Sequence, residues 1–299
     1  MADTTIDTVT VPRTWSRRRL GRSIAHWAMP AFTVLAIVYL LIPIAVMIIF
    51  SFNDYRGKFN FIWQGFTLDA WLHPLAWHGL PESIRTSLLI ATLSTVFATI
   101  LGTLIALALT RYRFRGRGAV NGLIFLPMAS PEIVLGASLL TLFVNVTIQN
   151  GILPPGLGLV PKGSLSLGFP TILIAHIMFN ISYVVVTVKA RVSGFDRRLE
   201  EAAMDLGANE WTTFWKVTFP LIFPGIMAAA LLSFSLSIDD FVITNFVSGT
   251  TNTFPIWVYG VVRNELPAQI NVIGSIVFLS AVTFVALTTL RSGRAMRIR

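Results

Sequence analysis

The sequence predicts an all-α, polytopic membrane protein with about six transmembrane helices and both termini in the cytoplasm. Of its 299 residues, 54% are hydrophobic and only 12% are charged, whereas soluble domains average about 45–50% apolar and about 25% charged residues. Apolar runs of about 20 residues, which is the length that crosses a hydrocarbon core of about 30 Å, recur along almost the whole chain. The basic residues gather in alternate connecting loops. Little length remains for a separate soluble domain.

Six apolar segments have the length of a membrane span and are bounded by charges or by Gly and Pro. They are residues 24–50, 88–109, 123–146, 171–188, 220–238 and 272–290. The first follows an arginine cluster, as a secretory signal would, but it far exceeds the apolar length of a signal peptide. We therefore expect a cytoplasmic tail over residues 1–23, one transmembrane domain over residues 24–290, and a second cytoplasmic tail over residues 291–299. Prolines inside several spans predict kinks.

The orientation follows from the basic residues. All but five of the 23 lysines and arginines fall in the two tails and in the loops after the second and fourth spans. Because lysine and arginine are enriched in cytoplasmic loops, this side is predicted to be cytoplasmic. Both termini then lie inside, the number of spans is even, and the loop over about residues 189–219 faces the cytoplasm.

Several classes of function find no support in the sequence. The net charge is +9, but the basic residues flank apolar runs instead of forming one basic face, so a nucleic-acid partner is not expected. The chain has no cysteine and four scattered histidines, so no metal site is expected. Neither a catalytic dyad nor a phosphate-binding P-loop occurs in the sequence. We therefore expect no catalytic residue and no cofactor bound by this chain.

The most informative segment is the predicted cytoplasmic loop before the fifth span. Residues 199–206 read Leu-Glu-Glu-Ala-Ala-Met-Asp-Leu, which are mostly good helix formers. Gly207 comes next and can turn the chain through a positive φ angle. A second amphipathic stretch leads to Pro220, which suits the first turn of the following helix. The loop is thus predicted to project rigidly from the membrane.

This pattern resembles the EAA loop of binding-protein-dependent ABC importer permeases. The residues that match the motif in register are Glu201, Ala202, Ala203, Gly207 and Pro220. Val217 and Phe219 stand where the family has other apolar residues. The resemblance implies a type I ABC importer permease fold and a coupling helix that docks on a cytoplasmic ATPase subunit. The residues implicated in coupling are Glu200, Glu201, Ala202, Ala203, Asp205, Gly207 and Pro220. The alternative is an ordinary cytoplasmic helical hairpin.

Two other stretches carry a narrower resemblance. Residues 126–136 read Leu-Pro-Met-Ala-Ser-Pro-Glu-Ile-Val-Leu-Gly, and residues 235–244 read Ser-Leu-Ser-Ile-Asp-Asp-Phe-Val-Ile-Thr. Both are similar to stretches of spermidine/putrescine permeases, specifically of the second of the two paired subunits, and the similarity covers about residues 85–290. Permeases for iron, phosphonates and opines share parts of the pattern, so these solutes remain alternatives.

Carboxylates within the predicted spans are candidates for the solute pathway. Glu132 lies about halfway along the third span, where an ionised side chain is costly and by default functional. Asp239 and Asp240 lie about 28 Å along a helix from Pro220, which predicts a place near the outer mouth. Glu132 could instead cap backbone groups freed by the preceding proline or pair with another permease subunit. The two aspartates could be solvated or could contact a binding protein.

Two polar stripes accompany these carboxylates. Ser233, Ser237 and Asp240 follow the spacing of one helix face. His176, Asn180 and Tyr183 do the same on the fourth span. Carboxylates, hydroxyls and an aromatic ring could accept a di- or triammonium chain through hydrogen bonds and cation–π contacts, although ordinary polar packing would produce the same pattern. The candidate pathway residues are Glu132, Asp239, Asp240, Tyr183, Asn180 and Ser237.

The expected function is that of a permease subunit in the cell membrane of a prokaryote. The resemblance implies four kinds of partner: a second homologous permease, two copies of an ATPase subunit that use ATP, an extracytoplasmic solute-binding protein, and the lipid membrane. The predicted solute is a polyamine such as spermidine or putrescine. The alternatives are an ABC permease for another small solute and a secondary transporter that uses Glu132 as its ion site.

Overall fold

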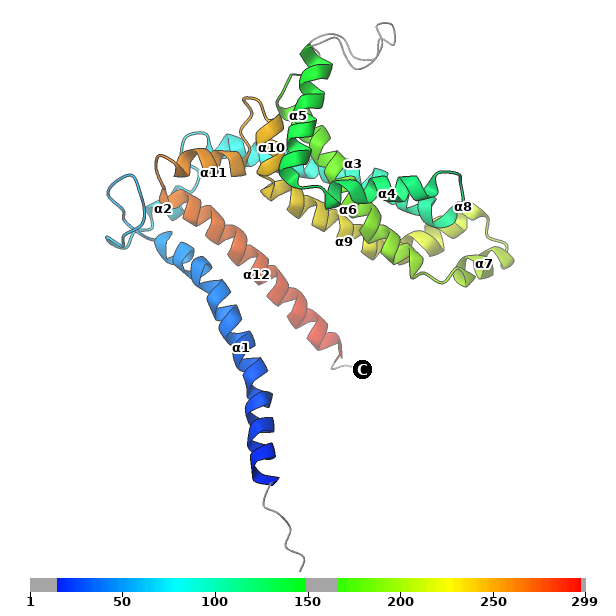
Figure 1. The fold of residues 1–299 in the computed structure, drawn as a ribbon, viewed down its shortest axis with the longest axis horizontal. Helices are drawn as coiled ribbons and strands as arrows, with labels where there is room; N and C mark the ends of the chain where they lie inside the picture. Colours follow the sequence, from blue (N-terminus) through cyan, green and yellow to red (C-terminus); the bar gives the residue numbers. More distant parts are fainter. Residues whose placement is uncertain (1–14, 149–165, 297–299) are drawn as a thin grey trace, which may run out of the picture. The chain divides into compact units, whose positions relative to one another are not determined.

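The computed structural model describes residues 15–148 and 166–296, and these residues contain helices and loops but no β-strand. The helices (Figure 1) are α1 (Trp15–Phe50), α2 (Asp69–Leu72), α3 (Leu80–Arg111), α4 (Arg117–Ala129), α5 (Glu132–Ile148), α6 (Phe169–Ser193), α7 (Arg198–Asp205), α8 (Glu210–Thr213), a π-helical turn (Phe214–Thr218), α9 (Phe219–Asp239), α10 (Val242–Val247), α11 (Phe254–Val262) and α12 (Ala268–Met296). The predicted all-α class is confirmed.

Each of the six predicted spans falls on helical structure. Four segments are long and apolar enough to cross a membrane, namely Ala28–Phe50, Leu80–Arg111, Phe169–Ser193 and Glu210–Asp239. The bent pair of α4 and α5 makes a fifth if it is counted as one span, and α12 contributes a shorter apolar stretch, Ala268–Thr283. The placement of both termini in the cytoplasm stays a prediction.

The third predicted span differs from the expected continuous helix. α4 ends at Ala129, α5 begins at Glu132, and the two helices are bent by 109° at the break. Ser130 is extended, with φ −80° and ψ 139°, because the ring of Pro131 disfavours a helical conformation in the residue before it and the proline has no N–H to continue the ladder. Glu132 is therefore the first residue of α5, at the break within the bent pair, and its place halfway along a membrane span stays a prediction.

The described residues divide into two compact units. One unit contains α1, α2 and α12, and α1 packs against α12 where a Cβ on Gly274 would lie 2.6 Å from the Met47 sulfur. Its loop is held by Asn53, whose Nδ2 donates to Asn60 Oδ1 at 2.6 Å. The Trp71 indole N–H donates to Ser51 Oγ at 3.1 Å. These contacts give the segment after α1 a defined structure.

The second unit runs from Leu75 to Glu265 and is built on α3, α6 and α9, which pack against one another. Small and β-branched side chains fill the contact, including Ala106 on α3, Val184 on α6 and Ala229 on α9, all fully buried. A Cβ on Gly102 would lie 2.6 Å from Val184 Cγ1. Such small residues let apolar helices approach closely, and this three-helix core supports the sites described below.

A second apolar cluster joins α5, α6 and α10. Leu139 of α5, Phe179 of α6 and Val247 of α10 belong to it. A Cβ on Gly136 would lie 2.6 Å from the Phe246 ring, so α5 and α10 are in close contact. This cluster fixes the short helix that follows the end of α9.

Candidate functional site

The segment predicted to couple to an ATPase forms a helix, a tight turn and a second helix. α7 ends at a turn in which Gly207 has φ +89° and its N–H donates to Met204 O at 2.9 Å. Asn209 then caps α8, because its Oδ1 accepts a hydrogen bond from the Thr212 N–H at 2.8 Å. The structure confirms the predicted conformation of this segment, which is a short helix, a positive φ angle at Gly207 and a second helix.

The loop joins its membrane helix without a break. Residues Glu210–Asp239 run as one helical segment in which the π-helical turn connects α8 to α9. Pro220 lies in the first turn of α9, where its missing N–H and fixed φ angle are tolerated. The predicted role of Pro220 in opening this helix agrees with its position.

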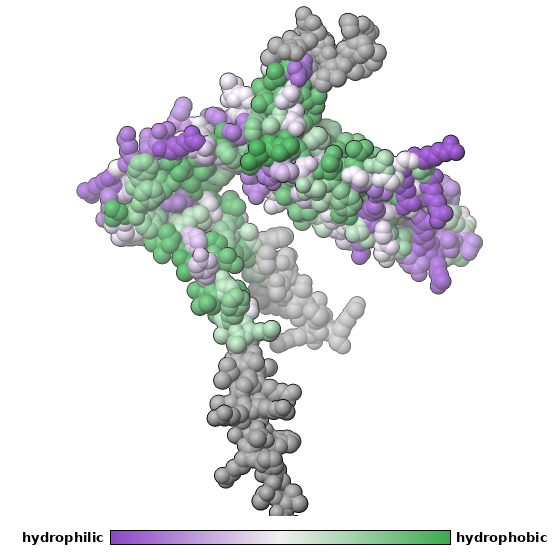
Figure 2. All heavy atoms as spheres, viewed as in Figure 1, coloured by the Kyte–Doolittle hydropathy of each residue, from purple (hydrophilic) through white to green (hydrophobic). Residues whose placement is uncertain are grey.

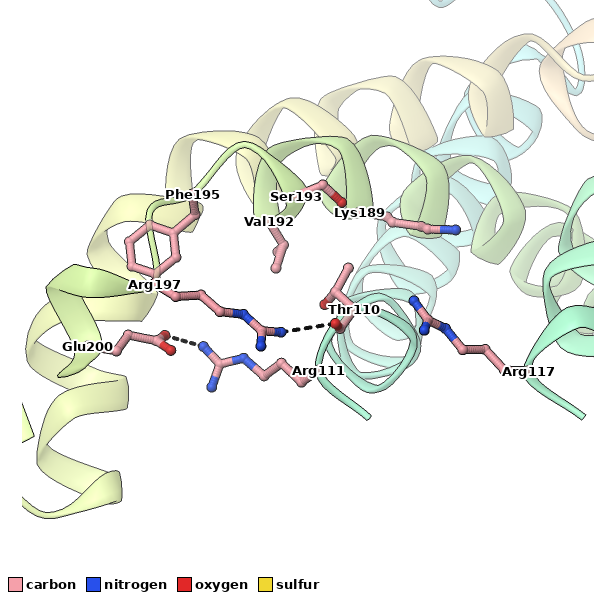
Figure 3. A pocket seen from close by; sticks show the side chains of 9 residues that line it. All are labelled: Thr110, Arg111, Arg117, Lys189, Val192, Ser193, Phe195, Arg197 and Glu200. Atoms are coloured by element: carbon pink, nitrogen blue, oxygen red, sulfur yellow. Dashed lines mark hydrogen bonds and ion pairs between the residues drawn. The ribbon is translucent and has the colours of Figure 1, made fainter. Parts of the chain in front are cut away.

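Glu200 anchors the loop to the three-helix core. Its carboxylate forms an ion pair with Arg111 at the end of α3 and accepts a hydrogen bond from the Thr218 hydroxyl. Arg197 adds a second attachment, because its Nη2 donates to Thr110 O at 3.1 Å. Figure 3 shows both attachments as dashed lines. Since the Glu200 side chain is only 15% exposed, it faces the core and not the solvent.

The opposite side of the loop is open. Glu201, Ala202 and Asp205 are exposed, and Ala203 is half-buried. Two large apolar residues also stand in solvent, Leu206 at 90% and Trp211 at 71% exposure. Hydrophilic residues gather at the end of the unit that carries α7 and α8 (Figure 2). Both side chains are therefore accessible to a binding partner.

A buried polar network joins α3, α6, α9 and α10. His176 makes hydrogen bonds through Nδ1 to Ser237 Oγ at 2.6 Å and through Nε2 to Thr244 Oγ1 at 2.8 Å. The Asp240 carboxylate accepts bonds from the Thr244 N–H at 2.8 Å and from its hydroxyl at 2.7 Å. Ser94 of α3 completes the network with a 2.9 Å bond to Ser237. Asp240 Oδ2 also lies 3.4 Å from His176 Nε2.

The remaining members of the two stripes lie among the packed helices. Asn180 and Ser233 are fully buried, and their side chains have no hydrogen-bond partner within the part of the chain that the structure describes. Tyr183 is half-buried, and its ring lies 4.9 Å from that of Phe179. The predicted stripes therefore face into the unit, and Ser237 and Asp240 meet His176 there.

The other two candidate carboxylates are exposed. Glu132 begins α5 and Asp239 ends α9. Asp239 thus differs from its sequence neighbour Asp240, whose carboxylate accepts hydrogen bonds from Thr244. Among the six candidate pathway residues, Ser237 and Asp240 are brought together by His176.

Several residues of these sites were not predicted from the sequence. Arg111 and Thr218 hold Glu200, and Ser94 and Thr244 belong to the His176 network. The i, i+4 spacing of Asp240 and Thr244 could have indicated their contact. Nothing in the local sequence places Ser94 or Arg111 beside its distant partner.

The architecture is that of a helical membrane transport component, with membrane-length helices and an exposed helix–turn–helix loop at one end of the packed unit. The chain matches the family described as "Binding-protein-dependent transport system inner membrane component" over residues 98–295. It belongs to this family and is an inner-membrane protein.

Named relatives cover most of the chain. The spermidine/putrescine transport system permease protein PotC of Escherichia coli K12 is 39% identical over 84% of this chain and 89% of its own length. PotC of Haemophilus influenzae is 37% identical over 87% of this chain and 94% of its own. The putrescine transport system permease protein PotI of Escherichia coli K12 is 34% identical over 89% and 92%, respectively. All three are transport components.

Solved structures share the fold. A chain of a bacterial ABC transporter involved in the import of alginate superposes with a TM-score of 0.68 at 20% identity, covering 91% of this chain and 99% of that one. A second alginate transporter structure, in complex with a periplasmic protein, gives a TM-score of 0.64 at 19% identity over 89% and 95% of the two chains. The fold is that of an ABC importer permease.

Proposed function

We propose that the chain forms half of the translocation pathway of an ATP-driven importer of polyamines. The observation that carries the proposal is the 39% identity, over 84% of the chain, to a permease named for spermidine and putrescine. The relatives of Haemophilus influenzae and the putrescine permease PotI point to the same class of solute. The other half of the pathway would come from a second, homologous permease.

The α7–Gly207–α8 loop couples this pathway to ATP hydrolysis in a partner. Two copies of a cytoplasmic ATPase subunit use the ATP, and this chain itself binds no cofactor. The exposed Leu206 and Trp211 are suited to an apolar cleft, and the small Ala202 and Ala203 allow close approach. An extracytoplasmic binding protein delivers the solute.

Transport by the assembled complex tests the function. The chain, its partner permease and the ATPase subunits are reconstituted in proteoliposomes with binding protein outside and ATP within. We expect ATP-dependent uptake of labelled spermidine or putrescine that unlabelled polyamines inhibit and that iron, phosphonate or opine compounds leave unchanged. Inhibition by one of the latter solutes instead would reassign the substrate, and uptake that follows an ion gradient without ATPase subunits would favour a secondary transporter.

The exposed carboxylates are the better candidates for solute contact. Glu132 and Asp239 have free surfaces in this chain, whereas Asp240 is engaged by Thr244 and faces His176. Glu132→Gln and Asp239→Asn are expected to lower polyamine uptake while the thermal stability of the complex is kept. Asp240→Asn is expected to lower the stability as well. Wild-type uptake by both of the first two variants at equal expression would remove them from the pathway.

A further inference from the structure

A cavity of about 360 Å³ lies at the end of α3, beside the start of α4, the end of α6 and the base of α7. Four of its nine lining residues are basic: Arg111, Arg117, Lys189 and Arg197. Glu200 is the one acid among these nine. Figure 3 shows these side chains around the cavity: Arg111 and Arg197 lie on the side of Glu200, and Lys189 and Arg117 lie on the other side of Thr110.

The positive charge of the cavity is only partly balanced. The Glu200 carboxylate is already paired with Arg111. Lys189 Nζ donates to Asn121 Oδ1 at 2.6 Å, and Arg197 donates to the carbonyl of Thr110, so both have neutral partners. Lys189 is half-buried, whereas Arg197 is exposed. A partly buried charge such as that of Lys189 is unfavourable without an opposite charge, and an anion in the cavity would offset that cost.

Arg117 is the clearest sign of a missing partner. It is half-buried at the start of α4, yet its guanidinium makes no hydrogen bond or ion pair with any residue in the described ranges. A guanidinium presents a planar fork of donors that fits two oxygens of a phosphate. The cavity therefore offers a free bidentate donor beside two further uncompensated charges.

The expected level of the cavity in the membrane indicates which kind of molecule would supply the anion. Arg111 is the last residue of the apolar helix α3, and Lys189 lies in the last two turns of α6. Basic residues at the ends of apolar helices lie at the level of the lipid headgroups. Basic pockets between transmembrane helices on the cytoplasmic side bind phospholipid headgroups.

We propose that this cavity binds the phosphate group of an anionic phospholipid at the membrane surface next to the coupling loop. Arg117 and Lys189 make the principal contacts with the phosphate. Arg111 and Arg197 line the same cavity and also hold α7, so the bound lipid adjoins the attachment of that loop. A free phosphate offers the same oxygens, and the experiment separates the two sources.

Lipid binding to the intact complex tests the proposal. The full transporter is purified in detergent, given phosphatidylglycerol or phosphatidylcholine, and analysed by native mass spectrometry. Wild type is expected to retain phosphatidylglycerol in preference, and Arg117→Gln to retain about fivefold less, from the loss of one surface cation. Arg117→Lys should keep most of the binding. Arg113→Gln is the matched control, because Arg113 is exposed, lies in the segment just before α4 and does not line the cavity.

Three results would overturn the proposal. Equal retention of the two lipids by the wild-type transporter would overturn it, whatever the variants do. Retention of phosphatidylglycerol by Arg117→Gln at the wild-type level would also overturn it. Displacement of the lipid by excess inorganic phosphate would assign the cavity to a soluble anion.

Discussion

Gly207 shows how a single backbone angle shapes the α7–Gly207–α8 loop. Its φ of +89° lies in the left-handed region, and a Cβ placed there would meet no atom within 4 Å. Glycine is favoured at this position because of the backbone conformation, and not because a larger side chain would clash with neighbouring atoms. An alanine costs about 1–2 kcal/mol through its backbone alone, whereas a proline would force φ to about −65° and remove the N–H that bonds to Met204.

We expect Gly207→Pro to uncouple transport while the protein still inserts into the membrane, with Gly207→Ala causing a smaller defect. The measurement is polyamine uptake per ATP hydrolysed by the reconstituted complex, together with the amount of the chain in membranes. Gly118→Ala is the control, because Gly118 also faces open space but does not have a positive φ angle. Unchanged coupling in Gly207→Pro would show that the turn has no role in transmission.

Glu200 and Glu201 are neighbours with opposite environments, and they offer a second test. Glu200→Gln removes a charged hydrogen-bond acceptor from Arg111 and Thr218, at a cost of about 1–3 kcal/mol. We expect faster proteolysis of the loop in the purified protein and a lower melting temperature. Glu201→Gln changes an exposed side chain, so both readouts should stay at wild-type values. Equal behaviour of the two variants would contradict the anchoring role.

At the scale of the elements, local signals predicted the loop and missed the contacts between helices. Residues 199–220 carry their own helix formers, glycine and proline, so their conformation follows from nearby residues. Periodicity placed Ser237 and His176 on helix faces, but it could not show that these faces meet, because the rotation of each helix is set by its neighbours. The prolines predicted a kink in this span, but the sequence did not give the size of the bend, which is 109° between α4 and α5.

The close approach of α3 and α6 gives a prediction at the same scale. A Cβ on Gly102 would lie 2.6 Å from Val184 Cγ1 and 2.8 Å from its Cβ, so Gly102→Ala should destabilise the protein by about 1–3 kcal/mol through overpacking. Thermal unfolding in detergent measures the effect, and Val184→Ala in the same chain should restore part of the stability. Gly122→Ala faces open space and is the control. A melting temperature equal to wild type in Gly102→Ala would refute the tight contact.

For the whole molecule, composition and hydropathy were sufficient to predict an all-α membrane protein. Both quantities are averaged over many residues, so they do not depend on any single contact between side chains. Sidedness remains a prediction from basic residues, and the absence of cysteine makes it simple to test. We expect Phe61→Cys to react with an impermeant thiol reagent applied to intact cells. Leu206→Cys should react only in inside-out vesicles, and added ATPase subunits should protect it.

Phe61 and Leu206 are both largely exposed, so access of the reagent depends on the membrane and on partners. Labelling of Leu206→Cys from outside intact cells would reverse the predicted orientation. Labelling of Leu206→Cys in inside-out vesicles that added ATPase subunits do not reduce would agree with the predicted orientation. It would contradict the proposal that Leu206 contacts the ATPase.

The unbroken run from Glu210 to Asp239 has a mechanical consequence. Its 30 residues correspond to a rod of about 45 Å at 1.5 Å per residue. One end carries Trp211 in the exposed loop, and the other carries Ser237, which bonds to His176. A displacement of Trp211 would therefore reach that buried hydrogen bond through one continuous helical segment, and the π-helical turn lies on this path near the loop.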